Sequence, residues 1–340
     1  MNTFAYALLN WYRRNQRQLP WRKNPDPYWI YVSEIMLQQT RMETALPYFL
    51  SFIRELPTLE DLADVDDDKL MKLWEGLGYY SRARNLKKGA QYIISEFGGI
   101  LPDEAEKLKT IPGIGPYSAG AIASTLYQKP VCAIDGNVIR VFSRLYRLEE
   151  VHPSSALKKE VQEKVLSFLP ASCPGDFNQA LMELGALICK PASANCADCP
   201  LAAMCLSANK DDAASFPRRR AKKPKQEEKH TVLLLEAGEK IAVHKKQTGL
   251  LKGLYSFPMT KGHLSAEETE AFLKKKGLQA KEVTYSGESS HVFSHRIWHM
   301  IFYRIILEGE TEQYEWMENN DLRGIAIASA FRKAKDIINI

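Results

Sequence analysis

The sequence predicts a multidomain protein in which an all-α domain, residues 1–216, is followed by an α+β domain, residues 230–340. Up to about residue 207, apolar residues recur at spacings of three and four, which is typical of amphipathic helices. Beyond residue 230, short apolar runs alternate with turn residues, which is typical of strands. A basic segment interrupted by prolines, residues 217–229, lies between the two patterns and predicts a linker.

Within the second domain the individual elements can be assigned from turn and strand signals. Gly238-Glu239 separates two short apolar runs and predicts a tight hairpin turn. The predicted strands are 231–237, 240–244 and 297–307, and the predicted helices are 266–275 and 325–338.

Composition and charge narrow the class of protein. Of 340 residues, 45% are hydrophobic and 26% are charged, which is typical of a soluble globular protein. The N-terminus has no basic region followed by an apolar stretch, and no run approaches the roughly 18 apolar residues of a membrane helix. We therefore expect a cytoplasmic protein with no membrane partner.

The positive charge is concentrated in one segment. Seven Lys or Arg and two Glu lie between Arg218 and Lys229, so this segment alone accounts for the net charge of +5. Basic side chains next to phosphates release condensed counterions, which favours a nucleic-acid partner. A solvated linker without a partner explains the same charges.

Four cysteines crowd into one short segment. Cys189, Cys196, Cys199 and Cys205 are separated by six, two and five residues. Zinc sites usually combine two close pairs separated by a longer segment, whereas one winding loop can surround a [4Fe-4S] cluster. The spacing favours the cluster over zinc, and the close grouping argues against four unrelated thiols.

A glycine-rich turn lies between two segments whose sequence permits helix. Residues 108–119 contain Pro112-Gly113-Ile114-Gly115-Pro116. Glycine permits positive φ, and its missing Cβ lets backbone N–H groups approach a phosphate at a helix N-terminus. The same turn could serve only as a helix connection.

Two carboxyl groups are candidates for chemistry. Glu34 is flanked by Ile30 to Val32 and Ile35 to Leu37, a setting that disfavours its ionised form, although a position on the helix surface is the alternative. Asp135 precedes a predicted helix, residues 138–146, so it can serve as an N-cap, as a fixed carboxylate near a developing cation, or as both.

Together these features resemble a known family. The glycine-rich hairpin, Asp135 and the cysteine loop resemble the endonuclease III superfamily of helix-hairpin-helix DNA glycosylases. Residues 29–40, Trp-Ile-Tyr-Val-Ser-Glu-Ile-Met-Leu-Gln-Gln-Thr, narrow the resemblance to the MutY family of adenine glycosylases. The resemblance implies a [4Fe-4S] cofactor held by the four cysteines. It also implies hydrolysis of the N-glycosidic bond of adenine opposite 8-oxoguanine or guanine in double-stranded DNA.

The resemblance assigns catalytic roles to four residues. Glu34 protonates the adenine ring at N7, and Asp135 stabilises the oxocarbenium ion on the sugar. Tyr117 replaces the lysine with which bifunctional members attack C1′, which implies a monofunctional hydrolase, although Tyr117 could also be a packing aromatic. Asn137 completes the expected catalytic group.

The resemblance also implies residues that contact DNA and the flipped base. Gln39 and Tyr79 match intercalating residues, although Tyr79 could equally be a core aromatic. The segment that matches the adenine pocket contains Arg17, Leu19, Trp21 and Arg22, and the hairpin contributes Gly113 and Gly115. Without the resemblance, the residue 17–22 segment reads as the exit of an amphipathic helix.

The second domain resembles a Nudix domain. The order Arg-Glu-x-x-Glu-Glu that holds metal in Nudix hydrolases is absent from residues 249–278, so the domain is expected to recognise rather than hydrolyse. Phe293, Ser294 and His295 match the loop by which MutY-like proteins recognise 8-oxoguanine. An ordinary strand turn is the alternative.

Three other functions fit parts of the sequence. A glycosylase for damaged pyrimidines is disfavoured by Tyr117 and by the second domain, and a nucleotide diphosphatase by the missing metal pattern. A DNA damage sensor without catalysis would need neither Glu34 nor Asp135. We expect the protein to act as a monomer.

Overall fold

The structure of the protein is a computed structural model that describes residues 2–221 and 224–340. Lys222 and Lys223, part of the predicted basic linker, lie outside the described residues. The chain forms two compact units, one of Met1–Ala63 with Arg84–Lys222 and one of Asp64–Ala83 with Lys223–Ile340. The predicted boundaries at residues 216 and 230 stay a proposal.

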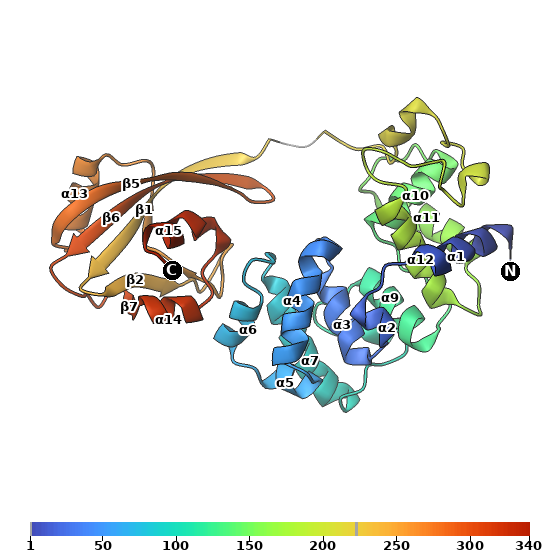
Figure 1. Cartoon of the computed structure of the whole chain (residues 1–340), viewed down its shortest axis with the longest axis horizontal. Coiled ribbons are helices and arrows are strands. Elements are labelled where there is room, and N and C mark those ends of the chain that lie inside the picture. Colours follow the sequence, from blue (N-terminus) through green and yellow to red (C-terminus); the bar gives the residue numbers. More distant parts are fainter. Residues whose placement is uncertain (1, 222–223) are drawn as a thin grey trace. The chain divides into compact units, whose positions relative to one another are not determined.

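The first unit is helical, as predicted. Its helices are α1 (Thr3–Asn15), α2 (Pro20–Lys23), α3 (Pro27–Met36), α4 (Met42–Glu55), α5 (Leu59–Asp64), most of α7 (Ser81–Phe97), α8 (Ala105–Leu108), α9 (Pro116–Tyr127), α10 (Gly136–Tyr146), α11 (Ser155–Phe168) and α12 (Pro174–Leu187), with the 3-10 helices η1 (Ala202–Met204) and η2 (Asp211–Ser215). Figure 1 shows α1, α10, α11 and α12 beside one another. Their apolar faces bury a shared core that includes Leu8, Phe142, Leu157 and Phe177.

Local sequence explains where the helices that carry the site begin. The Asp26 side chain accepts a hydrogen bond from Trp29 N, and Pro27 occupies the first position of α3. The Asp135 side chain accepts from Val138 N at the start of α10. These caps fix the first turns of the two helices that hold the candidate carboxyl groups.

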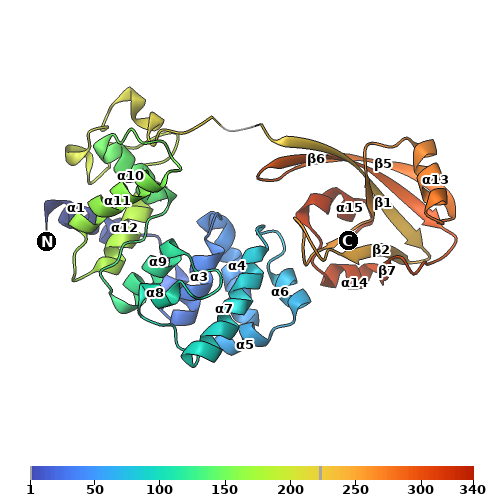
Figure 2. The same cartoon turned by 180° about the vertical axis from the view of Figure 1, so that it is seen from behind.

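The second unit contains a mixed sheet. Its elements are α6 (Asp67–Leu73), β1 (Gln226–Ala237), β2 (Lys240–Lys245), β3 (Tyr255–Ser256), β4 (Met259–Lys261), α13 (Ala266–Lys275), β5 (Ala280–Val292), β6 (Arg296–Leu307), β7 (Glu315–Glu318), α14 (Asn319–Gly324), η3 (Ser329–Phe331) and α15 (Arg332–Ile337). The strands run in the order β3-β2-β1-β6-β5, with β4 paired to β1 and β7 paired to β2. The β1–β6 pair is parallel. Helix α13 packs against β5 (Figure 2), and Leu233, Leu273 and Ile305 share one core.

Most elements predicted for this unit are confirmed. The hairpin of β1 and β2, the strand β6 and the helix α13 lie where the sequence places them. β1 begins at Gln226, so its first four residues fall inside the segment predicted as a linker. Strand β5 was not predicted, because most of its side chains are exposed and polar and give no apolar run.

The helix predicted over residues 325–338 is wrong in its first half. Tyr255 N donates to Ala326 O at 2.9 Å, and Ala328 N donates to Tyr255 O at 3.3 Å, so this segment is extended. Helix resumes only at η3 and α15. Pairing with a distant strand overrides a local helical pattern here.

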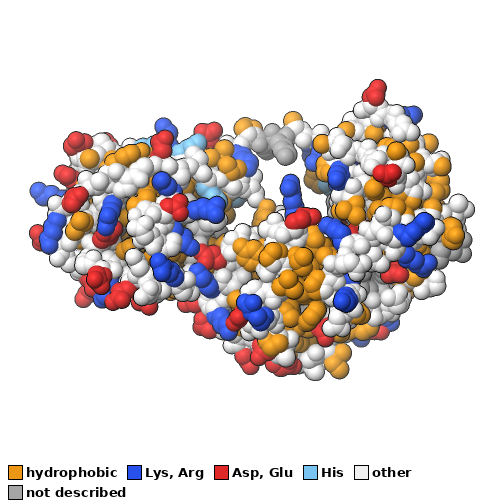
Figure 3. All heavy atoms as spheres, viewed as in Figure 1, with side chains coloured by type: hydrophobic (Ala, Val, Ile, Leu, Met, Phe, Trp, Pro, Cys, Tyr) orange, Lys and Arg blue, Asp and Glu red, His pale blue; other side chains and the backbone are white. Residues whose placement is uncertain are grey.

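Two further features concern membrane-spanning helices and surface charge. Among the described residues, no helix is both long and apolar enough to cross a lipid bilayer. Acidic and basic side chains are interspersed on the face of the second unit shown in Figure 3.

Candidate functional site

Glu34 lies on α3 between the fully buried side chains of Tyr31 and Ile35. Its Oε2 atom is shielded from solvent and has no hydrogen-bond partner among the described residues. Burial raises the pKa of Glu34 to about 7, while the nearby Tyr117 hydroxyl lowers it by a smaller amount. The carboxyl group therefore keeps its proton in a large fraction of molecules near neutral pH.

Tyr117 lies in the first turn of α9 and faces Glu34. Its hydroxyl donates to Met182 Sδ on α12 at 3.1 Å. Burial, with Glu34 next in effect, raises the pKa of Tyr117 well above its ordinary value. The ring therefore stays neutral and lies beside the candidate acid, so it contacts both the site and α12.

Asp135 caps α10, so the N-cap role considered for it is confirmed. Its Oδ1 accepts from Val138 N at 2.8 Å, and its Oδ2 accepts from Asn137 Nδ2 at 2.7 Å. Burial raises the pKa of Asp135, and these N–H donors act against that rise. Asp135 also raises the pKa of Glu34 by charge repulsion, so the structure brings the two predicted carboxyl groups within electrostatic reach.

Asn137 connects Asp135 to the cysteine loop. Arg140 Nη2 donates to Asn137 Oδ1 at 2.7 Å, and Arg140 Nε donates to the Cys189 carbonyl at 2.8 Å. Helix α10 therefore carries a continuous set of hydrogen bonds from Asp135 to the first cysteine. Arg140 was not assigned from the sequence, because its partners lie far along the chain.

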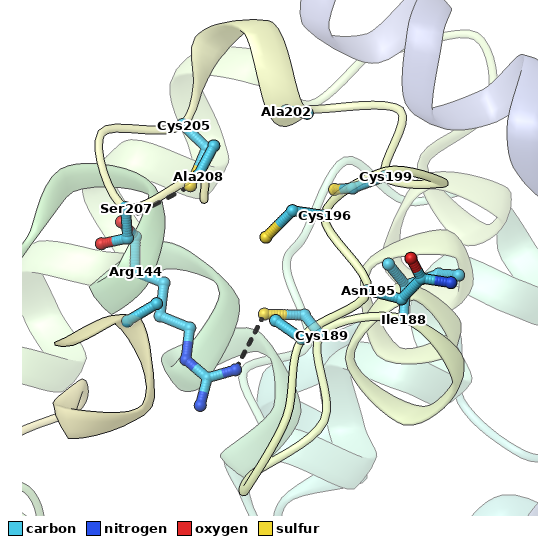
Figure 4. A pocket seen from close by; sticks show the side chains of 12 residues that line it. Arg144, Ile188, Cys189, Asn195, Cys196, Cys199, Ala202, Cys205, Ser207 and Ala208 are labelled. Carbon is cyan, nitrogen blue, oxygen red and sulfur yellow. Dashed lines mark hydrogen bonds between the residues drawn. The ribbon is translucent and has the colours of Figure 1, made fainter. Parts of the chain in front are cut away.

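The four clustered cysteines line one cavity. Figure 4 shows the thiols of Cys189, Cys196, Cys199 and Cys205 directed into it. Arg144 Nη1 donates to Cys189 Sγ at 3.3 Å. Among the described residues, no three His, Cys, Asp or Glu side chains converge as ligands of a single metal ion. Four thiols spaced around a cavity fit a polynuclear cluster.

The guanidinium of Arg144 also holds the backbone around this cavity. It donates to the carbonyls of Lys190, Pro191 and Phe216 at 2.7, 2.7 and 3.1 Å. Arg144 is buried. The cavity wall is therefore braced by one side chain of α10.

The glycine-rich turn joins α8 to α9. Gly113 has φ of +89°, and a Cβ there would lie 3.1 Å from Asn85 Cβ, so glycine is required. Gly115 has φ of −92°, and a Cβ there would meet no atom within 4 Å. Its missing side chain instead leaves open space at the N-terminus of α9, where backbone N–H groups can meet an anion.

Gln38 braces this turn and was not assigned from the sequence. Its Nε2 donates to Gly113 O at 3.1 Å and lies 3.2 Å from Ser118 Oγ. The neighbouring Gln39 is exposed and has φ of +57°. Of these adjacent glutamines, Gln38 is therefore bonded within the fold and Gln39 is exposed to solvent.

Tyr79 is exposed rather than part of the core, which rules out one reading of the sequence. Its side chain is 46% exposed and its φ is +48°. Left-handed backbone is uncommon outside glycine and often marks functional segments. Within the second unit its hydroxyl lies 3.0 Å from Ser294 Oγ.

The segment from Arg17 to Arg22 is organised by Glu183, a residue that the sequence did not single out. Glu183 on α12 is 1% exposed, and its carboxylate accepts from Arg17 Nε at 2.9 Å and from Arg22 Nη2 at 3.1 Å. Burial raises the pKa of Glu183, but the two arginines outweigh burial and lower it to about 2. The partners are 166 and 161 residues apart, so no local pattern could reveal them.

Leu19 and Trp21, in the same segment, are buried. The Trp21 ring packs edge-on against Phe49 with centroids 4.6 Å apart. Both side chains thus contribute to the core of the first unit.

Phe293, Ser294 and His295 form the turn between β5 and β6. Ser294 and His295 are exposed and Phe293 is half-buried.

On α13, Glu268 and Glu267 bond to Ser265 at the helix N-terminus, as in a capping box. These acids are therefore engaged in starting the helix.

Two family profiles match the chain. Residues 32–167 match the HhH-GPD superfamily of base excision DNA repair proteins, and residues 230–336 match the NUDIX domain. The chain is 31% identical to the adenine DNA glycosylase of Homo sapiens over 98% of this chain and 73% of that protein. It is 32% identical to the adenine DNA glycosylase of Buchnera aphidicola subsp. Baizongia pistaciae over 97% of this chain and 95% of that protein.

Solved structures resemble part of the chain. A thermostable thymine-DNA glycosylase is 27% identical with a TM-score of 0.56, and the match covers 61% of this chain and 95% of that one. The endonuclease III in a non-covalent DNA complex is 22% identical with a TM-score of 0.50, over 62% of this chain and 98% of that one. The second comparison shows a shared fold.

Proposed function

Because the chain belongs to the adenine DNA glycosylase family of HhH-GPD base excision repair enzymes, we propose that it releases adenine mispaired with 8-oxoguanine or guanine from double-stranded DNA. The observation that carries this proposal is the carboxyl of Glu34, whose Oε2 is shielded from solvent without a hydrogen-bond partner and whose pKa burial raises to about 7. A sensor without catalysis would have no use for such a group.

The first chemical step is protonation of the base. Adenine is a poor leaving group until its ring accepts a proton, and a carboxylic acid with a pKa near the working pH is an efficient donor. Glu34 supplies this proton to N7 of an adenine that has been flipped out of the duplex. Tyr117 lies beside Glu34 and limits where the sugar and base can sit.

The second step is stabilisation of the sugar cation. Loss of adenine leaves positive charge near C1′, and a fixed carboxylate next to it lowers the barrier. Asp135 is held by Val138 N and Asn137 Nδ2, which favour its ionised form. Water then completes hydrolysis at C1′.

The reaction is expected to stop at base release. Bifunctional glycosylases attack C1′ with an amine, and a phenol hydroxyl with a raised pKa cannot replace it. Tyr117 occupies the hairpin position of that amine, so we assign the protein to the monofunctional class.

The four thiols suit a [4Fe-4S] cluster. Cys189, Cys196, Cys199 and Cys205 would hold it, and Arg144 would donate a hydrogen bond to the first of them. When bound, such a cluster ties the loop together through four iron–thiolate bonds and can exchange an electron. No step of base release depends on it here.

Substrate recognition is divided between two regions. Arg17 and Arg22, fixed by Glu183, offer N–H donors near the adenine. The exposed turn Phe293–His295, with Tyr79 beside Ser294, is the expected site for 8-oxoguanine. Gln39 and Tyr79 would fill the gap that the flipped base leaves, and the hairpin glycines would admit a phosphate. We further propose that the protein acts in the cytoplasm as a monomer.

Base release from matched duplexes tests this function. The protein with its cluster is incubated with duplexes carrying adenine opposite 8-oxoguanine, guanine or thymine, and free adenine is quantified by chromatography. Release from the first two duplexes and little from the third is expected. Equal release from all three, or release of a damaged pyrimidine instead, would overturn the proposal.

Replacement of the turn tests the recognition step separately. Changing Phe293, Ser294 and His295 together to alanine should remove the preference for 8-oxoguanine over guanine while adenine is still released. An unchanged preference would remove this turn from the recognition site.

A further inference from the structure

Strand β1 lies beside the turn Phe293–His295, although its first four residues were predicted to belong to a linker. Strand β1 runs parallel to β6 from the pair Gln226 and Arg296 onward, so the start of β1 lies directly beside the residues that leave the turn. Figure 1 shows β5 and β6 projecting from the body of their sheet, with the start of β1 alongside. The turn is therefore supported at its base by residues of β1.

One carboxylate on that strand is engaged by three side chains. Glu228 Oε1 accepts from Arg296 Nη1 at 2.9 Å, and Glu228 Oε2 accepts from Trp298 Nε1 at 2.8 Å. His230 Nε2 lies 3.4 Å from the same Oε2. Because side chains two residues apart on a strand share a face, all of these groups meet on one side of the sheet.

The contact between Glu228 and Trp298 extends to Phe293. The Trp298 ring packs edge-on against the Phe293 ring, with centroids 4.8 Å apart at 70°. The His291 ring also packs edge-on against the Phe293 ring, with centroids 4.5 Å apart at 67°. Trp298 is 8% exposed, so its indole cannot turn without losing this packing. The hydrogen bond that Trp298 Nε1 donates to Glu228 thus fixes the ring that orients Phe293.

The contact between Glu228 and Arg296 extends to His295. Arg296 donates through Nη1 to Glu228 and through Nε to His295 Nε2 at 3.0 Å. Phe293 and His295 flank Ser294, and each touches a side chain that Glu228 holds. Neighbouring Lys225 adds a bond from its Nζ to Phe293 O at 2.7 Å.

We propose that Glu228 is a positioning residue for discrimination of the base opposite adenine, acting through Trp298 and Arg296 on the two residues that flank Ser294. In this role Glu228 does not itself contact DNA. The inference rests on the proposed role of the turn in recognising 8-oxoguanine. A rigid turn pays less conformational entropy when it binds, so loosening it should weaken binding to 8-oxoguanine more than it affects chemistry on adenine.

The chain offers a matched control. Glu236 lies eight residues further along β1 and forms a two-bond ion pair with Arg304, at 2.7 and 2.8 Å. Its side chain is 13% exposed, against 22% for Glu228. Glu236→Gln therefore removes a comparable pair from the same strand at a place that does not touch the turn.

The test uses the full-length protein with its cluster and two duplexes, with adenine opposite 8-oxoguanine or guanine. Affinity is measured on duplexes that carry a non-cleavable adenosine analogue, and single-turnover adenine release is measured on cleavable ones. Glu228→Gln places an amide N–H donor against the donors of Arg296 or Trp298, and Trp298→Phe removes only the indole N–H and part of the ring.

Glu228→Gln is expected to lower the ratio of affinities, 8-oxoguanine over guanine, by about tenfold, a typical effect of losing a hydrogen bond to a charged group. The single-turnover rate on adenine opposite guanine should stay within about twofold, and Glu236→Gln should leave the ratio unchanged. Trp298→Phe should lower the ratio as well. The double variant should lose less than the product of the two single losses, because both break one contact.

Three outcomes would overturn the inference. The ratio could survive Glu228→Gln while alanine replacement of the turn abolishes it, which would leave the proposed function standing and remove only Glu228. Glu236→Gln could lower the ratio equally, which would mean a general loss of stability. Finally, the ratio could survive replacement of the turn itself, in which case the recognition role fails first and the inference with it.

Discussion

Glu34 and Glu183 are two shielded glutamates in the same helical unit, and their surroundings drive them in opposite directions. Glu34 has an unpartnered oxygen, and burial raises its pKa to about 7. Glu183 receives two arginines and a backbone N–H, which lower its pKa to about 2. Burial alone therefore does not decide the charge of a carboxyl group; the donors supplied with it do. One group is left able to give up a proton, and the other is a permanent anion that orders its neighbours.

The largest expected effect is on the chemistry of Glu34. Glu34→Gln keeps the shape of the side chain but removes the acidic proton, so adenine release should fall by about 10²- to 10⁴-fold. Single-turnover release of adenine opposite 8-oxoguanine measures it, with Glu236→Gln as a control of equal chemical change. A rate within a few fold of the unmodified protein would mean that Glu34 is not the acid.

The next effect separates the two glutamates by stability. Glu183→Gln removes the buried anion that Arg17 and Arg22, both half-buried, share, and should lower the free energy of unfolding by about 3 kcal/mol. The contribution of Glu183 is present above its ordinary pKa of 4.5 and is lost as pH falls toward 2. Denaturant unfolding at pH 7 measures the loss.

Glu34→Gln should shift stability the other way in the same experiment. Because the fold raises the pKa of Glu34 from 4.5 to about 7, holding this residue costs stability as pH rises through that window. Above pH 7 the variant should be more stable than the unmodified protein, by up to about 3 kcal/mol. If both substitutions destabilised the protein equally at pH 8, the contrast between the two sites would be wrong.

A smaller effect concerns pH and rate. A general acid must be protonated, so release should be fastest below the pKa of Glu34 and should fall by about tenfold per pH unit well above pH 7. Single-turnover rates between pH 5.5 and 9 on one duplex measure this. A flat profile across pH 7 would contradict the assignment of Glu34 as the donor.

The smallest expected effect is a gain of activity. Tyr117→Lys places an amine beside Glu34 and Asp135, where it can attack C1′ and permit strand cleavage. Minor but measurable nicking without alkali or heat is expected on denaturing gels, and the unmodified protein should show almost none. Clean nicking by the unmodified protein would count against the monofunctional assignment, and Tyr117→Phe serves as the control without an amine.

Features that depend on neighbouring residues could be predicted from the sequence. The four cysteines that the sequence groups line one cavity, Asp135 is confirmed as a helix cap, and Gly113 has positive φ, because each depends on a few consecutive positions. The hairpin of β1 and β2 follows for the same reason. Helix 325–338 fails in its first half because Tyr255, far along the chain, pairs with its backbone.

The amino-acid sequence by itself determined which side chains are present, where the turn of the first hairpin lies, that Asp135 caps a helix, and that four thiols would be close together, because these depend on short spacings. Only the tertiary structure decided how those side chains are charged and oriented. No sequence pattern distinguishes Glu183, but in the structure α12 places it beside Arg17 and Arg22. In the sequence Glu228 is one acid in a basic segment, but in the structure its strand β1 lies beside β6. The reason is physical: pKa and orientation are set by atoms within a few ångströms, and those atoms come from distant parts of the chain.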